Sequence, residues 1–364
     1  MPRKMSLVVS CVLGMFLMLV AGCVISPRRT PGQTGGGPTP SPTPTPTPAP
    51  GAPTGILYVS DQNSNSILRF NNAFTASGNI APNATISGAA TGLASPQYLA
   101  LDADADRLFV ANVNGPNVLV FDKVSTLSGN AAPTRVLNVT ANFVTPTDVV
   151  LDKGSDLLYV ADGQEIFVLG NVSASTTSGS IQPVRDITTA FTIQALFLDT
   201  TNDRLYAADA VNNAIKIFDN ASIINGLSAA NRSITGPLTG LSRPDGITLD
   251  PAGNIVISNL NGSITVYAAA NSSTGVGAIN VAPIAAIAGS STTLASPGQM
   301  VRNLAPSAGE VFVADPTAGE VAVFSGVASA GGNTAPARNI VGSATTITVA
   351  GKQTARGVAL DTQR

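Results

Sequence analysis

Residues 108–121 read LFVANVNGPNVLVF, two apolar runs separated by a short turn that contains Asn and Gly. Runs rich in Val, Leu and Phe on either side of such a turn are typical of an antiparallel β-hairpin. The phrase recurs at intervals of 47 to 56 residues; the other copies are LYVSDQNSNSILRF from 57, LYVADGQEIFVL from 158, LYAADAVNNAIKIF from 205, IVISNLNGSITVY from 255 and VFVADPTAGEVAVF from 311. A period of this length indicates a repeat architecture.

Two further predicted strands flank each hairpin. Short runs precede it, most of them ending in Asp; they are PQYLALD from 96, PTDVVLD from 146, QALFLD from 194, PDGITLD from 244, the divergent PGQMVRN from 297 and RGVALD from 356. A looser segment follows each hairpin, such as SGNAAPTRVL from 128. Four strands per unit in six units predict an all-β protein, a six-bladed β-propeller with four-stranded blades.

The two ends of the repeat predict how the ring closes. The first unit, from Gly55, begins with its second strand, whereas the chain finishes with an inner strand that has no unit of its own. We therefore expect residues 358–361 to pair beside residues 56–59 and to complete the first blade. This pairing would hide two strand edges that would otherwise be open.

The N-terminus has the features of a secretory signal. Arg3 and Lys4 precede an apolar run over residues 5–20, which is short for a membrane span. The run ends at Val-Ala-Gly-Cys, which resembles the bacterial lipoprotein lipobox. The resemblance implies cleavage after residue 22 and acylation of Cys23, with palmitate-type chains that anchor the protein stably. An uncleaved anchor, or an ordinary signal peptide with an incidental cysteine, is the alternative.

A low-complexity tether follows the predicted lipidation site. Residues 27–54 read PRRTPGQTGGGPTPSPTPTPTPAPGAPT, and the alternating prolines of residues 38–50 favour polyproline II with a reach of about 40 Å. The predicted domains are thus a signal peptide over 1–22, a lipidated tether over 23–54 and a propeller over 55–364. Val24 follows the cysteine, so by analogy with lipoprotein sorting we expect the outer membrane of a Gram-negative cell.

Composition removes several classes of chemistry. The chain has no histidine and two cysteines, of which Cys11 lies in the predicted signal and Cys23 is the predicted lipidation site. A Ser-His-Asp triad, a Cys-His nucleophile and a histidine-ligated zinc are therefore excluded. All 21 acidic residues follow the tether, whereas four of the 19 basic residues lie before Gly55, so the body has a formal charge of −6. We expect no nucleic-acid partner, no cofactor and no metal.

The combination of P-x-x-I-x-L-D with L-Y-V-A-D-x-x-N-x-I-x-V-F resembles the NHL-repeat propellers, and LYVAD and LFVAN are also similar to the YVTN type. The resemblance covers about 310 residues, from Gly55 to the end. It implies binding of proteins or small ligands around a central channel, or in a minority of relatives a lyase or lactonase activity. The lactonases hold a divalent cation through Glu, Asn and Asp; here Glu165, Glu310 and Glu320 all lie outside the predicted inner strands.

Residues at the start of the predicted inner strands vary where the scaffold does not. We expect them around the channel mouth on the loop-rich face, where they would orient a small polar ligand. Solvated rim residues without a partner are the alternative interpretation. The candidate ligand-binding residues are Gln97, Tyr98, Asp148, Gln194, Asp245, Gln299, Arg302 and Arg356.

The aspartates that end the inner strands are expected to cap turns rather than to bind a ligand. They are Asp102, Asp152, Asp199, Asp250 and Asp361. In LDADADRLFVAN, residues 101–112, Asp104 is additional to the repeat. We expect no calcium site there, because the glycine and the distal glutamate of an EF-hand loop are missing.

These observations favour a membrane-tethered, non-catalytic binding module of the cell envelope, with a monomeric body and a protein or envelope glycan as partner. One alternative is a metal-dependent lactonase or esterase with Asp148 or Asp245 as base or ligand. The other is a purely structural or adhesive surface module.

Overall fold

The structure is a computed structural model that describes residues 54–364 except 140–142, 174–178, 274, 305–308 and 348–353. Contacts divide the chain into two units, Met1–Pro50 and Gly51–Arg364. The predicted signal peptide, Cys23 and nearly all of the tether lie outside the described residues. Within the described part, no helix combines the length and the apolar character needed to cross a membrane.

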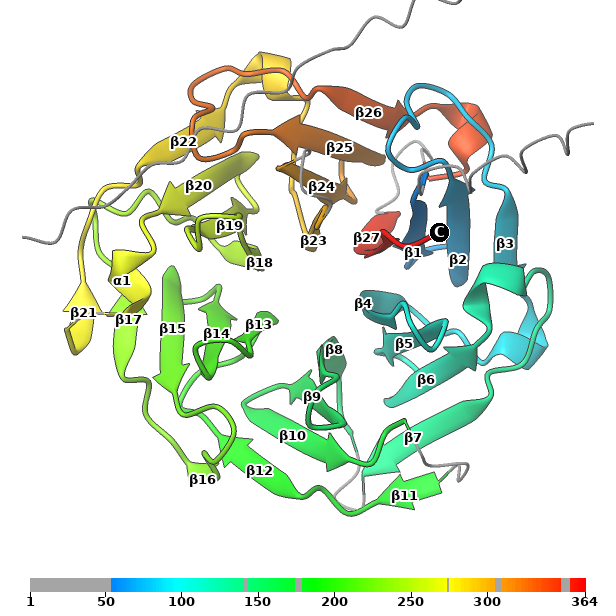
Figure 1. The fold of residues 1–364 in the computed structure, drawn as a ribbon, viewed down its shortest axis with the longest axis horizontal. Coiled ribbons are helices and arrows are strands. Elements are labelled where there is room, and N and C mark those ends of the chain that lie inside the picture. The colour runs from blue at the N-terminus through cyan, green and yellow to red at the C-terminus, as the bar shows by residue number, and fades with distance from the viewer. Residues whose placement is uncertain (1–53, 140–142, 174–178, 274, 305–308, 348–353) are drawn as a thin grey trace, which may run out of the picture. The chain divides into compact units, whose positions relative to one another are not determined.

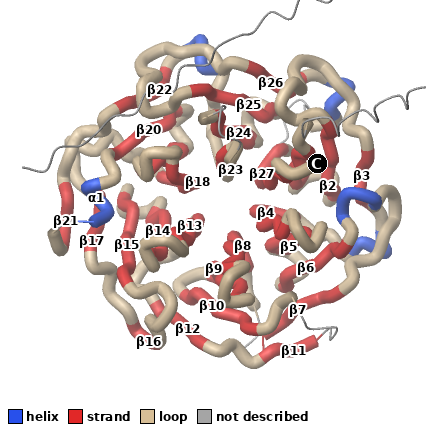
Figure 2. Tube along the Cα trace, in the orientation of Figure 1, coloured by secondary structure: helices blue, strands red, loops and turns tan. Residues whose placement is uncertain are grey.

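Residues 54–364 form six small sheets arranged as blades around a central channel (Figure 1). Three sheets have four strands and three have five. The loops connect successive strands within each blade and then lead to the next blade, and helical turns are short and peripheral (Figure 2). The predicted six-bladed propeller is confirmed.

Strand bounds repeat from blade to blade. The inner strands are β4 (Pro96–Asp102), β8 (Pro146–Asp152), β13 (Ala195–Asp199), β18 (Pro244–Leu249), β23 (Met300–Arg302) and β27 (Ala355–Asp361). The second strands are β1 (Ile56–Asp61), β5 (Arg107–Asn112), β9 (Leu157–Asp162), β14 (Arg204–Asp209), β19 (Ile255–Asn259) and β24 (Glu310–Asp315).

The outer half of each blade is equally regular. The third strands are β2 (Ser66–Asn71), β6 (Asn117–Asp122), β10 (Glu165–Gly170), β15 (Ala214–Asp219), β20 (Ser263–Tyr267) and β25 (Glu320–Ser325). The fourth strands are β3 (Ala84–Ser87), β7 (Arg135–Val139), β12 (Arg185–Thr188), β17 (Arg232–Ile234), β22 (Ala285–Ala288) and β26 (Arg338–Val341). The helical turns are α1 (Ala270–Ser273), η1 (Ala89–Thr91), η2 (Val124–Thr126), η3 (Ser290–Thr292) and η4 (Ser343–Thr345).

The ring closes through β27, as the ends of the repeat predict. β27 pairs antiparallel with β1, with Ile56 opposite Asp361 and Val59 opposite Val358. Strands from the two ends of the chain therefore share the first blade, in the order β27-β1-β2-β3. Neither β1 nor β27 is left with the open edge that a chain without this pairing would present.

Apolar side chains fill the space between neighbouring blades. Residues such as Leu57, Val59 and Val358 of the first blade pack in one cluster with Phe312 and Val321 of the last. Inner and second strands are apolar on both faces because both faces are covered by adjacent blades. The aromatic residues at or near the end of the third strands are at most 1% exposed and pack rather than face a ligand; they are Phe70, Phe121, Phe218, Tyr267 and Phe324.

A parallel connection between blades was not expected from the sequence. The loop after the third strand lies beside the fourth strand of the preceding blade, as β11 (Gly179–Ile181), β16 (Gly226–Leu227) and β21 (Gly277–Ile279) in three cases. At the other three interfaces the same loop makes a single parallel bridge from Gly78, Gly129 or Gly332. The outer edge of each blade is thus covered by its neighbour.

Asparagine side chains reinforce five of these interfaces. Each accepts a hydrogen bond at 2.6–2.9 Å from a backbone amide of the preceding blade; the acceptors are Asn79, Asn130, Asn225, Asn280 and Asn333. The approach is close: a Cβ at Gly88, where φ is +118°, would lie 2.5 Å from Asn130 Oδ1. Glycine is required there because other residues rarely adopt this backbone conformation.

We name the two faces of the propeller by its inner strands. The N face is where these strands begin, for example at Pro96 and Pro146, and the C face is where they end, for example at Asp102 and Asp152. The inner strands surround the axis of the ring (Figure 1), and we call the space between them the central channel.

Candidate functional site

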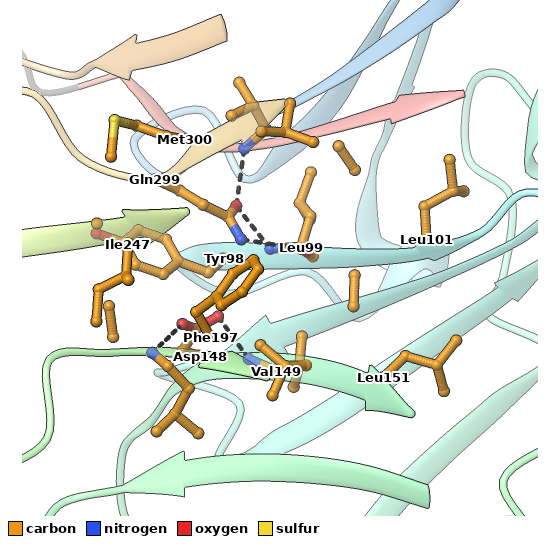
Figure 3. Close-up of a pocket in the computed structure, with 18 of the residues that line it drawn as sticks. Tyr98, Leu99, Leu101, Asp148, Val149, Leu151, Phe197, Ile247, Gln299 and Met300 are labelled. Carbon is orange, nitrogen blue, oxygen red and sulfur yellow. Dashed lines mark hydrogen bonds between the residues drawn. The ribbon is translucent and has the colours of Figure 1, made fainter. Parts of the chain in front are cut away.

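A cavity of about 290 Å³ follows the central channel. Its walls are mostly apolar side chains of the inner strands, among them Leu101, Leu151 and Leu198, and polar side chains occur at its two ends. At the C face it adjoins a wider hollow of about 650 Å³ with which it shares Phe197 and Arg302. Figure 3 shows the N end of the cavity, with Tyr98, Asp148 and Gln299, and Leu101 and Leu151 farther along the walls.

An ion pair lies at the N end of the channel. Arg356 Nη1 is 2.8 Å from Asp245 Oδ2, and Arg356 Nη2 donates to Asp245 Oδ1 at 3.1 Å. The Arg356 guanidinium lies over the Tyr98 ring, 5.4 Å from its centre, and the Tyr98 hydroxyl donates to the Asp245 carbonyl oxygen at 2.9 Å. The Asp245 side chain is fully buried and that of Arg356 is 11% exposed. The three side chains therefore connect the blades whose inner strands are β27, β4 and β18.

Protonation of this group follows from its burial. Burial lowers the pKa of Arg356, but the acidic groups around it, Asp245 among them, raise it by more, so the pKa lies above its ordinary value and the guanidinium is charged. Burial likewise raises the pKa of the Tyr98 hydroxyl well above its ordinary value. Tyr98 is thus a neutral hydrogen-bond donor.

The side chains of Asp148 and Gln299 form hydrogen bonds with backbone groups of the inner strands. Asp148 Oδ1 and Oδ2 accept from the Val149 and Leu196 amides, both at 2.7 Å. Gln299 Oε1 accepts from the Leu99 and Val358 amides at 3.0 and 2.9 Å, and its Nε2 donates to the Leu99 oxygen at 2.9 Å (Figure 3). Backbone groups on an unpaired strand edge need partners when they are buried. These two side chains supply them across the channel.

Gln97 and Gln194 also lie at the N face and are half-buried. Gln97 is the second residue of β4, and Gln194 directly precedes β13. The Gln97 carbonyl oxygen accepts from the Ser60 hydroxyl at 2.5 Å, and the Gln194 amide donates to the Ala208 oxygen at 2.9 Å. Seven of the eight candidate residues are therefore brought together at one end of the channel. Their role in binding a ligand stays a prediction.

Arg302 does not lie at the start of the inner strands, where the sequence predicted it. It lies at the C face, where its Nη1 donates to the Asp250 oxygen at 2.7 Å. The reason is geometric: Arg302 ends β23, and three residues of extended strand carry it roughly 10 Å along the channel from Gln299. The expected position at the same mouth as Gln299 was wrong.

Sequence reasoning missed the glycines and serines that let the blades approach at the N end. A Cβ at Gly357 would lie 2.4 Å from the Gln97 oxygen, and one at Gly246 would lie 2.3 Å from the Gly298 oxygen. Ser60 is opposite Gly357 and Ser258 is opposite Gly246 in the strand pairs. The available signal was Ser in these two copies of the repeat, because the other four have Ala at this position.

The aspartates that end the inner strands accept hydrogen bonds within their own turns, as expected. For example, Asp199 Oδ1 accepts from the Thr201 and Asn202 amides, both at 3.1 Å. Asp104, the additional aspartate, forms an ion pair with Lys153 of the next blade and accepts from Gln363 Nε2 at 2.5 Å. Its role is thus a contact between neighbouring turns.

Among the described residues, no group of three or more His, Cys, Asp or Glu side chains lies close enough together to hold a metal ion. The three glutamates lie at the first residues of the second or third strands: Glu165 begins β10, Glu310 begins β24 and Glu320 begins β25. None of the three lies on an inner strand.

The buried carboxyl group of Asp148 should make the free energy of unfolding depend on pH. Burial raises its pKa well above the ordinary value, although the amides of Leu196 and Val149 oppose the shift. The native state therefore binds this proton more tightly than the unfolded chain, in which Asp has a pKa of about 3.9. As the unfolded state binds fewer protons above that pH, this group makes the free energy of unfolding fall as pH rises.

We expect Asp148→Asn to remove this contribution, so that the variant gains stability relative to the wild type as pH rises from about 4 to 7. Urea titrations of both chains at several pH values measure the difference. The contributions of distant carboxyl groups are the same in both chains and cancel. A difference that does not change with pH would contradict the assignment.

No protein-family model matches the chain, and no curated protein matches it. Solved structures do resemble it. One is a functionally unknown protein from Desulfotomaculum acetoxidans DSM 771, with 16% sequence identity, a TM-score of 0.49 and 75% of each chain covered. Another is the nidogen/laminin complex, with 11% identity, a TM-score of 0.57 and coverage of 84% of this chain and 98% of that chain. The second similarity agrees with the propeller fold.

Proposed function

We propose that this protein is a lipid-anchored propeller of the NHL or YVTN type that acts as a non-catalytic binding module in the bacterial cell envelope, at the outer membrane. Its partner is a protein or an envelope glycan. The lipobox-like sequence at Cys23 and the proline-rich tether support display on a membrane. The observation that carries the non-catalytic role is that the buried acidic side chains at the N end of the channel already have partners: Asp245 pairs with Arg356, and Asp148 accepts from the Leu196 amide.

The alternative of a metal-dependent hydrolase needs Asp148 or Asp245 as base or ligand. Both Asp148 oxygens accept backbone hydrogen bonds, and both Asp245 oxygens face Arg356. A general base must reach the proton that it removes, and a carboxylate engaged in this way does not present a free oxygen to a substrate. This argument favours binding over catalysis, and a lactone panel with and without calcium or zinc tests it: turnover would support the hydrolase.

The anchor has a direct test. We expect Cys23→Ala to abolish incorporation of labelled palmitate and to release the protein from the membrane fraction, because several acyl chains are needed for stable anchoring. Cys11→Ala is the matched control and should be labelled like the wild type, since it lies in the predicted signal peptide. Continued acylation of Cys23→Ala would show that the lipobox assignment is wrong.

The binding role is tested on the acylated protein in its native membrane. Chemical crosslinking followed by purification should recover a specific protein or glycan that is absent when Cys23→Ala is used as bait. Recovery of the protein alone under several conditions would count against the proposal. An altered envelope after deletion, with no recovered partner, would favour the structural or adhesive alternative.

A further inference from the structure

The two ends of the channel differ in how deeply the lining side chains are buried. At the N end Tyr98, Asp148 and Asp245 are at most 1% exposed; the Tyr98 hydroxyl donates to the Asp245 oxygen, and Asp148 accepts from the Leu196 amide of the neighbouring blade. Toward the C face, Leu101 and Leu151 on the walls are only partly buried. A ligand that reaches the cavity therefore arrives from the C face, opposite to the loop-rich mouth that the sequence analysis considered.

The walls of the cavity suit an apolar body. Its volume of about 290 Å³ corresponds to roughly ten water molecules at about 30 Å³ each. Between the polar residues of the two ends, the lining side chains are Leu, Val, Ile, Ala, Met and Phe. Sites for small molecules combine such walls with a few polar groups that fix the orientation of the ligand.

Arg302 supplies one charged group at the open end. It lines both the cavity and the adjoining hollow, is partly exposed, and donates one hydrogen bond, to the Asp250 carbonyl oxygen. Within the described part of the chain, no carboxylate forms an ion pair with it. A guanidinium has five N–H donors in a planar fork that fits a carboxylate, so most of its donors are available.

The two nearby carboxylates are turned toward their own loops. Asp199 accepts from the Thr201 and Asn202 amides and from Asn202 Nδ2. Asp250 accepts from the Ala252 and Asn254 amides and from Asn254 Nδ2. Their oxygens are used in the turns, which leaves the guanidinium as the group that faces a ligand at this end.

We propose that the central channel binds a small organic carboxylate from the C face, with its apolar body between the inner strands and its carboxylate on Arg302. The proposal goes beyond the binding role proposed above and depends neither on the lipid anchor nor on a macromolecular partner. It is an independent site, at the opposite end of the channel from Asp245 and Arg356.

The test uses the full chain in lipid nanodiscs, with empty nanodiscs as background, and three probes of similar size: 3-phenylpropionate, 3-phenylpropan-1-ol and 3-phenylpropylamine. Ligand-observed NMR measures binding. We expect 3-phenylpropionate to bind most tightly. Arg302→Gln should weaken its binding by about tenfold and leave the alcohol unchanged, since a hydrogen bond to a charged group is lost.

Arg243→Gln is the matched control, because Arg243 is exposed at the N face, next to β18; it should bind all three probes as the wild type does. Ala100→Phe fills the channel wall and should abolish binding of every probe, with its folding checked by thermal melting. Absence of binding, tighter binding of the amine or the alcohol, or equal losses in Arg243→Gln and Arg302→Gln would overturn the proposal. So would unchanged binding in folded Ala100→Phe. None of these results bears on acylation or on the recovery of an envelope partner.

Discussion

Removal of residues 355–364 is expected to abolish the folded monomer. The deletion takes away β27, whose seven residues form the inner strand of the first blade and pair with β1. Val358 and Leu360 would leave the cluster that joins the first and last blades. The edge of β1 would then be open, and open edges pair with other chains. Size-exclusion chromatography and circular dichroism should show aggregated or unfolded protein.

Removal of Thr362, Gln363 and Arg364 alone is the control. It leaves β27 in place but takes away the Arg364 ion pair with Asp361 and the hydrogen bond from the Gly55 amide to the Arg364 oxygen. These exposed contacts are worth about 1–2 kcal/mol together, so this chain should stay monomeric and unfold cooperatively. If the longer deletion also gave a monomer with an unchanged urea midpoint, the ring would not depend on its closing strand.

This closure could be predicted from the sequence because it rests on local pattern. Each strand carries its own apolar run, and the sixth inner strand, which comes at the end of the chain with no hairpin after it, has one available partner, the unpaired first strand. The register follows from the repeat: in other blades the Asp that ends the inner strand lies opposite the first residue of the second strand, as Asp102 does with Arg107. Ile56 opposite Asp361 is the pairing that results.

The parallel bridges between blades could not be predicted in the same way. They are made by backbone groups of loops such as 78–80 and 129–131, and they depend on how closely two blades approach. That distance is set by glycines such as Gly88, which the repeat pattern treats as ordinary loop residues. A backbone contact leaves no periodic signal in the side chains.

The sequence predicted where most of the candidate site residues lie, but not which partners their side chains have. Strand order places Tyr98, Asp148 and Gln299 at one end of the channel, but the partners of each depend on side chains from distant blades. Arg356 and Asp245 are 111 residues apart, and nothing in either repeat identifies the other as its partner. Charged residues were therefore expected to be free for a ligand, whereas the structure pairs them.

Arg356→Met is expected to lower the free energy of unfolding by about 3–5 kcal/mol, because it leaves the Asp245 carboxylate buried without its partner. Asp245 is 0% exposed, so solvent does not replace the lost contact. The variant also loses the stacking of the guanidinium on Tyr98. Urea denaturation measures the change. If the dependence of the unfolding free energy on urea concentration keeps its slope, the native state is as compact as in the wild type.

Arg364→Met provides a matched control at the same end of the chain. Its partner Asp361 is buried, but the Arg364 side chain is 35% exposed, so we expect a loss of about 1 kcal/mol or less. The double variant Asp245→Leu with Arg356→Met should recover much of the stability lost in Arg356→Met, because removing both charges leaves none unpaired. A loss below about 1 kcal/mol in Arg356→Met would mean that the pair contributes little to folding. In that case Asp245 and Arg356 would again be candidates for binding a polar ligand at the N face, and the engagement of buried charges would no longer support a non-catalytic role.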